Sequence, residues 1–565
     1  LTLSETTSSW SNGGQNLTVS STLANDGTFT FTGAGTLNLP ATTAVSPLGG
    51  TFVYSGGTVP MESELAGYTN LTVSGGSITG QNATVAGTLN ITGGTLTIPN
   101  GTTLTLDGAT HTVSGGTLAI AGGGTVNAGT NGFTVGTAGS LTMGTAATSG
   151  GTLTCGTLNL GNTSGSGTII SAVDPSTVNA ATVTITGAAG STANINNINF
   201  VLTGESDWND SGFAGTWTPQ TGGSLTINGS ATPTIRSTHG LYSLTVNPGA
   251  LNAVSINTDP LRLAGNLTLQ SGTLSAGALG LSVAGDISDN TNTGELTFTT
   301  GTLTLDGSTT QTVDLSQATL YNLTINNTFA TSPQVTATGA ASLSGTLALN
   351  GGILDMVANQ LTLTGTGSIT NDGTGPTAAG GGGLASTGTI EFSGGGAQTA
   401  DLRNSTLGSA TITSAAKTGG SLSFPRGFTV GIFTTGAAGY NINFNTTSGS
   451  GGETTTLNNA AGAVFTNTGT LNIGNEDADA LVCTNGITAT GTGTNSFRGT
   501  LSTNGAAGHN ISLDDLGISG GTLVLDAGAA GTISVTGATS GSGFNLTIAN
   551  SNGATFGGAV GSSGA

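Results

Sequence analysis

The chain has 565 residues, of which 100 are glycine and only 6% are charged, which excludes collagen, with its strict glycine triplet, and the highly charged type of disordered chain. The chain has six Lys and Arg residues and 26 Asp and Glu residues, which gives a net charge of -20. The basic residues form no cluster in the sequence that could bind the phosphates of a nucleic acid, and an anionic membrane surface would repel the chain. No run reaches the roughly 18 apolar residues of a membrane helix, so we expect neither nucleic-acid binding nor membrane insertion.

One short word, Gly-Thr-Leu-x-apolar, recurs along the chain. It stands at residues 87–91, 94–98, 301–305 and 345–349. Apolar residues at alternate positions indicate a short strand that buries one face, and Thr between them suits the pleated outer face. Glycine at the ends of the word suits tight turns. We therefore expect Leu96, Leu303 and Leu347 to point into a core.

The strand words follow one another at the spacing of a solenoid. Leu89, Leu96 and Leu104 are seven and eight residues apart, so three strands with their turns take roughly 22–24 residues. Stacked coils place Leu on Leu inside and Thr on Thr outside, which lets a chain with few aromatic residues bury a core. The prediction is an all-β fold, one parallel β-helix continuous over residues 1–565, with roughly 24–26 coils.

A longer period overlies the coils. Residues 301–305, 311–315 and 322–325 return 87 positions later as 388–392, 398–402 and 409–412. In another copy of the same segment, Tyr242 and Tyr321 are 79 positions apart. This superperiod of about 80–87 residues corresponds to roughly four coils and shows that the turns tolerate insertions.

The repeated words also resemble a known class of protein. Gly-Thr-Leu-Thr-Leu-Asp-Gly at 301–307, Gln-Thr-Val at 311–313 and Tyr-Asn-Leu-Thr-Ile-Asn-Asn at 321–327 are similar to the strand repeats of large bacterial surface proteins. These are the filamentous-haemagglutinin-like adhesins and the autotransporter passengers. The resemblance implies a right-handed parallel β-helix that is exported, with a role in adhesion, stalks or fibres.

The alternative architecture is a row of β-sandwich domains of about 85 residues, which would match the long period. It predicts longer strands and an aromatic core residue in each domain. Tryptophan occurs only at positions 10, 208 and 217, outside any regular register, which favours the β-helix. The least regular stretches, near residues 204–222 and 372–385, are expected to leave the coil as loops.

Carboxylate pairs are the first places to look for catalysis, since glycoside hydrolysis needs two of them. Glu62 with Glu64 and Asp477 with Asp479 are two positions apart, so each pair would share one face of a strand. We interpret both pairs as solvated turn residues. The Ser414 and Lys417 spacing matches a penicillin-recognising motif by chance, since one lysine would have to serve two elements. We expect no catalytic residue and no enzyme.

The segment 205–212 is the best candidate for a cation or glycan site. Glu205, Asp207 and Asp210 offer oxygen ligands of the kind Ca²⁺ prefers, and Trp208 or Trp217 would stack on a sugar. The segment lacks the closing glutamate of a helix-loop-helix calcium site. We therefore favour a polar loop whose tryptophan caps the core, with no resident metal or cofactor.

Cys155 and Cys483 are too few for a disulfide framework or a metal set, and they lie too far apart along a straight solenoid to bond. Scarcity of Cys, Lys and Met favours an extracellular polymer. The chain begins at Leu1 without a signal-peptide core, so we expect a processed or truncated piece.

Arrays of Thr-x-Thr raise one more alternative, a regular hydroxyl face like that of ice-binding solenoids. Such a face needs the same register in coil after coil. Because the spacing of the words varies, we expect the register to drift and the face to be absent.

The preferred hypothesis is an extracellular structural protein of a surface fibre or layer, whose copies join end to end by strand pairing. An adhesin shaft that binds glycans is the second hypothesis, and a polysaccharide-active enzyme is the third. The partners expected are further copies of the chain and, for the second hypothesis, glycans.

Overall fold

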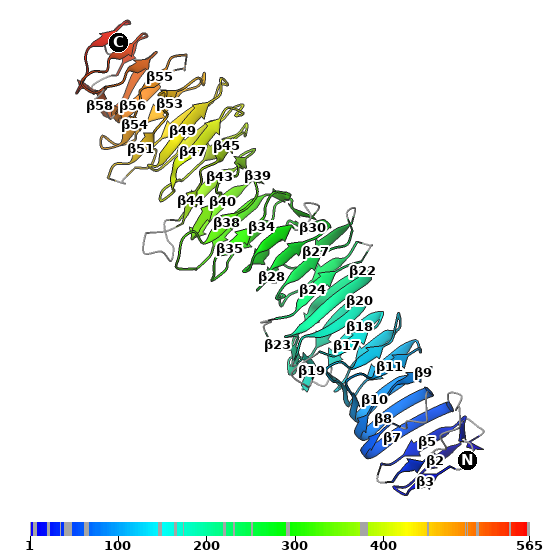
Figure 1. Ribbon diagram of the computed structural model, residues 1–565. Coiled ribbons are helices and arrows are strands. Elements are labelled where there is room, and N and C mark those ends of the chain that lie inside the picture. Colours follow the sequence, from blue (N-terminus) through cyan, green and yellow to red (C-terminus); the bar gives the residue numbers. More distant parts are fainter. Residues whose placement is uncertain are drawn as a thin grey trace. The chain divides into compact units, whose positions relative to one another are not determined.

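The structure is a computed structural model whose described residues form strands and no helix, arranged as a parallel β-solenoid of about 22 turns (Figure 1). Contacts divide the chain into unit 1, Leu1–Ser275 with Asp289–Glu295, and unit 2, Ala276–Ser288 with Leu296–Ala565. The described residues are 2–3, 8–19, 23–33, 35–38, 48–61, 67–144, 150–162, 167–172, 174–218, 222–229, 232–249, 252–289, 294–372, 382–448, 451–491, 493, 495–503, 508–541 and 544–561.

Most coils of unit 1 contribute one strand to each of three parallel sheets, because strands pair with the equivalent strand of the next coil. The first coils contain β1 (Thr2–Leu3), β2 (Ser9–Ser11), β3 (Leu17–Thr18), β5 (Thr28–Phe31), β6 (Leu37–Asn38), β7 (Leu48–Pro60) and β8 (Gly67–Thr79). The first sheet then contains β9 (Ala83–Val85), β11 (Thr103–Leu106), β14 (Thr125–Asn127), β17 (Thr152–Thr154), the first parts of β20 (Ser176–Gly187) and β22 (Ile198–Phe213), and β24 (Ser224–Ile227). The second contains the first part of β10 (Leu89–Ile98), β12 (Thr110–Val113), β15 (Gly132–Val135), β18 (Thr157–Asn162), the later parts of β20 and β22, and β25 (Thr234–Arg236). The third contains the last part of β10, β13 (Thr117–Ile120), β16 (Ser140–Met143), β19 (Gly167–Ala172), β21 (Ser191–Asn194) and β23 (Thr216–Thr218).

The core of unit 1 is a set of stacked aliphatic columns. Leu104, Val126 and Leu153 pair in successive strands of the first sheet, and each is 0% exposed. The residues between them point outward because successive side chains of a strand alternate between its faces. The predicted inward positions Leu96, Leu303 and Leu347 are also 0% exposed, which confirms that part of the prediction.

Unit 2 is built in the same way. In one of its sheets β34 (Thr302–Leu305), β37 (Asn322–Asn326), β40 (Thr346–Gly351) and β43 (Ser368–Asn371) pair in order. Its last coils contain β58 (Leu516–Asp526), β59 (Ile533–Val535), β60 (Thr539–Ser540), β61 (Asn545–Ile548) and β62 (Ala554–Phe556). Some coils are longer than predicted, since Leu361 pairs with Ile390 and Ile442 with Leu471, 29 positions apart in both cases. The turns are therefore fewer than the 24–26 expected.

The alternative of tandem sandwiches is wrong. Sandwich sheets are antiparallel, whereas every pairing among the described strands is parallel and joins one coil to the next. The right-handed winding and the continuity of one solenoid over residues 1–565 stay predictions.

The expected loop at 204–222 is wrong over most of its length. Residues 204–213 belong to β22, where Trp208 pairs with Val183 of the preceding coil and a register shift lies on either side of this pairing, and β23 follows at Thr216–Thr218. Polar residues enter this strand because Asp210 finds hydrogen-bond donors on the next coil. Of the other expected loop, residues 373–381 lie outside the described residues, while Gly383–Ala385 forms the strand β44.

Candidate functional site

The acidic segment that sequence analysis singled out lies on β22 and alternates between the two faces of its sheet. Asp207 and Asn209 are partly exposed, whereas Trp208 and Asp210 are each 0% exposed. Asp207 accepts hydrogen bonds on the outer side from the amide and the hydroxyl of Thr234 on β25. The backbone of Glu205 belongs to the same strand, but its side chain lies outside the described residues.

Asp210 is a buried carboxylate held by donors from its own strand and from the next coil. Its Oδ2 accepts from Trp208 Nε1 at 2.9 Å and from the Ser237 hydroxyl at 2.6 Å. Its Oδ1 accepts from the Thr238 amide at 2.8 Å, and His239 Nδ1 lies 3.3 Å away. The network satisfies both oxygens, which is the usual condition for burying a carboxylate.

An aromatic cluster covers the outer end of this network. The Trp217 and His239 rings stack at 4.7 Å between centroids, and Phe213 meets both edge to face. Trp217 and His239 are half-buried. His239 therefore links the buried carboxylate to the surface.

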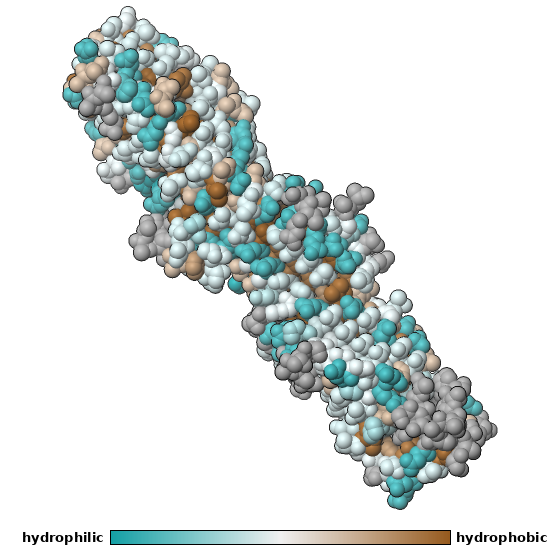
Figure 2. Space-filling model, viewed as in Figure 1, coloured by the Kyte–Doolittle hydropathy of each residue, from teal (hydrophilic) through white to brown (hydrophobic). Residues whose placement is uncertain are grey.

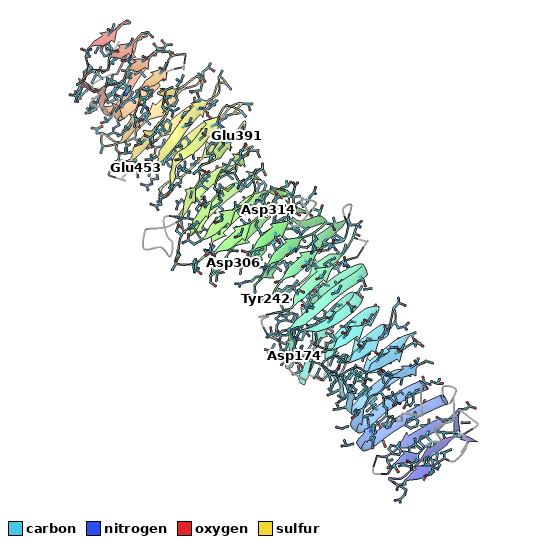
Figure 3. All side chains as sticks on the ribbon, viewed as in Figure 1. Asp174, Tyr242, Asp306, Asp314, Glu391 and Glu453 are labelled. Atoms are coloured by element: carbon cyan, nitrogen blue, oxygen red, sulfur yellow. The ribbon has the colours of Figure 1, made fainter. Side chains whose placement is uncertain are left out.

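This arrangement does not bring together the described members of the candidate cation site, Asp207 and Asp210. Asp207 and Asp210 point to opposite faces of β22, and Asp210 is already satisfied by protein donors. Among the described residues no three His, Cys, Asp or Glu side chains gather at one point. Figure 3 labels Asp306, Asp314, Glu391 and Glu453 of unit 2, which are dispersed over that unit rather than clustered.

Of the two tryptophans proposed to stack on a sugar, Trp208 is not available. Trp208 is packed edge to face against Phe200 with no exposed area, so its indole offers no surface to a sugar and the proposed stacking by Trp208 is wrong. Glycan binding by Trp217 stays a prediction.

Of the two carboxylate pairs the structure describes Asp477 and Asp479, and the interpretation as solvated residues is confirmed for Asp477 but wrong for Asp479. Asp477 is exposed, and its hydrogen bond from Arg498 and a further one from the Thr522 amide hold the pKa of that carboxyl below its usual range. Asp479 is buried and accepts from the backbone amides of Glu453, Asn475 and Glu476. Glu62 and Glu64 lie outside the described residues.

Both cysteines are free and buried, as predicted for thiols that do not bond to each other. Burial raises the pKa of Cys155 to about 12 and raises that of Cys483 as well. Neither thiol has the low pKa of a reactive cysteine.

Lys417 forms a buried polar cluster that sequence reasoning missed. Its ammonium donates to the carbonyl oxygens of Gly394 and Gly396 and to Gln398 Oε1, at 2.7–3.1 Å, and its side chain lies near the Tyr440 ring. The Ser414 hydroxyl bonds to the Tyr440 hydroxyl rather than to Lys417. Lys417 is 1% and Ser414 0% exposed, so the pair holds two coils together and is closed to a substrate.

The 87-residue repeat in the sequence contains a pattern from which the buried glutamine of this cluster could have been predicted. Gln311 and Gln398 occupy equivalent places 87 positions apart, and both are buried. In each, the side-chain Nε2 donates to two backbone carbonyl oxygens of an earlier coil. A glutamine that returns at the same place among apolar strands indicates a buried bridge between coils.

Lys417 gives a prediction for the pH dependence of unit 2. Burial lowers its pKa from 10.5 to about 8, so the unfolded chain binds this proton more tightly than the folded one. Stability should therefore rise with pH between about 8 and 10.5, by roughly 1–3 kcal/mol relative to the variant Lys417→Met. Urea unfolding of both proteins across this range measures the difference, and parallel pH profiles would contradict the assignment.

The outer side of the first sheet of unit 1 carries a regular array of hydroxyl and amide side chains, which we call the Thr face. It consists of Thr84, Thr103, Thr105, Thr125, Asn127, Thr152, Thr154, Thr177 and Asn179. Thr103 pairs with Thr125, Thr125 with Thr152 and Thr152 with Thr177, while the second column runs beside it in the same order. These pairings contain no register shift, so the expectation that the register drifts is wrong here.

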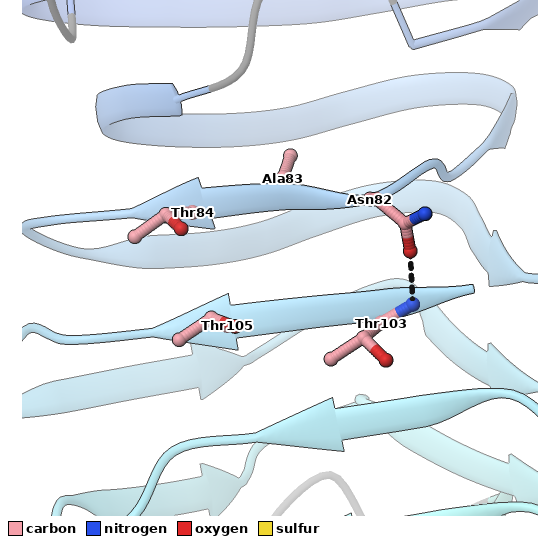
Figure 4. Close-up of a pocket in the computed structure, with 5 residues that line it drawn as sticks. All are labelled: Asn82, Ala83, Thr84, Thr103 and Thr105. Atoms are coloured by element: carbon pink, nitrogen blue, oxygen red, sulfur yellow. Dashed lines mark hydrogen bonds between the residues drawn. The ribbon is translucent and has the colours of Figure 1, made fainter.

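The coils differ in length along this face, but the extra residues lie between the strands. The step from Thr84 to Thr105 is 21 positions and that from Asn127 to Thr154 is 27, yet both pairs are in register. At one end of the face a shallow hollow of about 330 Å³ is lined by Asn82, Ala83, Thr84, Thr103 and Thr105 (Figure 4). Asn82 Oδ1 accepts from the Thr103 amide there at 2.8 Å.

Figure 2 shows a surface on which residues of intermediate hydropathy prevail, with scattered hydrophilic residues and small apolar spots. Within the described ranges no helix has the length and apolarity needed to cross a membrane. No protein-family model, curated protein or solved structure matches the chain. The structure shows a β-solenoid repeat fold, and the likeness to bacterial surface proteins stays a prediction.

Proposed function

We propose that the chain is an extracellular structural protein of a surface fibre or layer, and that its copies join end to end through parallel strand pairing. The observation that carries the proposal is the parallel β-solenoid itself, in which the described strands pair with the equivalent strands of the next coil. Strand pairing of the same kind between copies would build a fibre from the contacts that build the fold.

Exposed apolar residues on β61 and just before it offer a contact to another copy. Ile548 is 36% exposed and Phe544 is 41% exposed.

The extracellular location is supported by composition. The chain has two cysteines, three methionines and six basic residues in 565, and its net charge of -20 keeps a long polymer soluble. The β-solenoid itself suits a load-bearing repeat protein, since each coil contacts only its neighbours and length adds stability.

Sedimentation velocity of the 565-residue chain over a range of concentrations tests the assembly. We expect a concentration-dependent series of oligomers for the unchanged protein and a weakening of association by about tenfold or more for Ile548→Lys, which places a charge among these exposed apolar side chains. The matched control is Val464→Lys, on β52 (Ala463–Val464), because Val464 is 47% exposed on an outer face.

Two results would contradict the proposal. One is a strict monomer at every concentration. The other is an equal effect of both substitutions, because a general change in surface charge would then explain the loss. Far-UV circular dichroism of the variants confirms that they remain folded.

A further inference from the structure

The Thr face repeats in two directions. Paired strands lie about 4.8 Å apart, and alternate residues of one strand about 6.7 Å apart, so five coils give a grid about 20 Å long. The register is continuous from β9 through β20, which keeps the two columns straight. Both repeats are close to the spacings of oxygen atoms on a prism face of hexagonal ice.

The hydroxyl groups of the face are available to a ligand. Among the described residues Thr105, Thr125 and Thr152 make no side-chain hydrogen bond, although each hydroxyl can donate one and accept two. Thr154 of the same face accepts a hydrogen bond from Asn179, and on the second sheet Thr112 is bonded to Asn90 and Thr234 to Asp207. A free hydroxyl that donates and accepts can take the place of a water molecule in a lattice.

The side chains of the Thr face also restrict the class of ligand that it can bind. It carries no charged residue, which disfavours an ionic mineral, and no aromatic residue, which disfavours the sugar rings of a crystalline polysaccharide. Each threonine sets a methyl beside its hydroxyl, and apolar groups restrict the orientation of neighbouring water. The combination favours water that is already ordered.

We propose that the Thr face binds the surface of ice. The regular hydroxyl columns hold water at lattice positions while the methyl groups order the water between them. This activity does not depend on assembly of the chain into fibres, because the face lies on the side of unit 1 and is complete within one copy.

The test is uptake of the 565-residue chain into a growing ice hemisphere, together with the gap between its freezing and melting points. We expect the unchanged protein to enter the ice and Thr152→Arg or Thr177→Arg to lose most of this uptake, because either side chain stands above the grid. The matched control Thr134→Arg lies on β15 of the second sheet and should enter the ice as the unchanged protein does.

Three outcomes would overturn the proposal. The first is exclusion of the unchanged protein from ice. The second is an equal loss for Thr134→Arg, and the third is binding to microcrystalline cellulose that Thr152→Arg abolishes while ice uptake is absent. Circular dichroism spectra of all variants establish that the loss does not come from unfolding.

Discussion

Asp210→Ala is expected to lower the free energy of unfolding of unit 1 by about 3–5 kcal/mol, because it leaves buried donors without an acceptor. Trp208 Nε1, the Ser237 hydroxyl and the Thr238 amide all donate to this carboxylate. These groups lie on two successive coils, so the substitution also separates β22 from the turn after β25. Hydrogen exchange followed by mass spectrometry on peptides from β20 to β25 should show the loss locally.

The matched control is Asp207→Ala, three positions away on the same strand. Asp207 accepts from Thr234 on the partly exposed face, where water replaces a lost acceptor, so we expect a change below about 1 kcal/mol. Similar exchange rates for both variants would contradict the structural role given to Asp210. Asp210→Asn, which keeps the shape but loses the charge, should fall between the two.

Gly94→Ala is expected to destabilise unit 1 by at least about 3 kcal/mol, because two penalties add. Glycines at the corners between strand segments form a stack, with Gly57, Gly76 and Gly94 at φ angles of 75°, 79° and 68°. An L side chain is strained at such an angle, and a Cβ on Gly94 would also overlap the carbonyl oxygen of Gly76 in the coil before. Thermal unfolding of the full chain measures the effect.

Gly101→Ala separates the two penalties. Gly101 has nearly the same φ, 71°, but no atom lies within 4 Å of the position of its Cβ. Only the backbone strain of about 1–2 kcal/mol then applies. If both variants lose the same stability, the close approach of the coils at Gly94 is not a constraint.

Local sequence patterns predicted much of the fold. Leu96, Leu303 and Leu347 point inward because alternation of apolar and polar residues decides which face of a strand is buried, and that alternation is visible in any five residues. Composition, by contrast, misled the interpretation of residues 204–213. Their Asp, Asn and Trp content is typical of a loop, yet Trp208 and Asp210 alternate with Asp207 and Asn209 as strand residues do.

The candidate sites depended on neighbours that the linear order does not show. Asp210 is tolerable in a core only because Ser237 and Thr238 reach it from the next coil, 27 and 28 positions later. Lys417 is buried because Gly394, Gly396 and Gln398 place three oxygens around it. The straightness of the Thr face likewise follows from pairing between coils, since insertions of unequal length fall between the strands and leave the register unchanged.

For this protein the sequence by itself determined the class of fold, the short strands, their buried positions and the absence of a large cationic surface, because these properties follow from composition and from a period of two residues. Only the tertiary structure decided which polar side chains are buried, which tryptophan is closed to solvent and which threonines align into a face. The reason is physical: burial of a polar group and alignment of hydroxyls are properties of contacts between coils, and those contacts join residues about 20–30 positions apart.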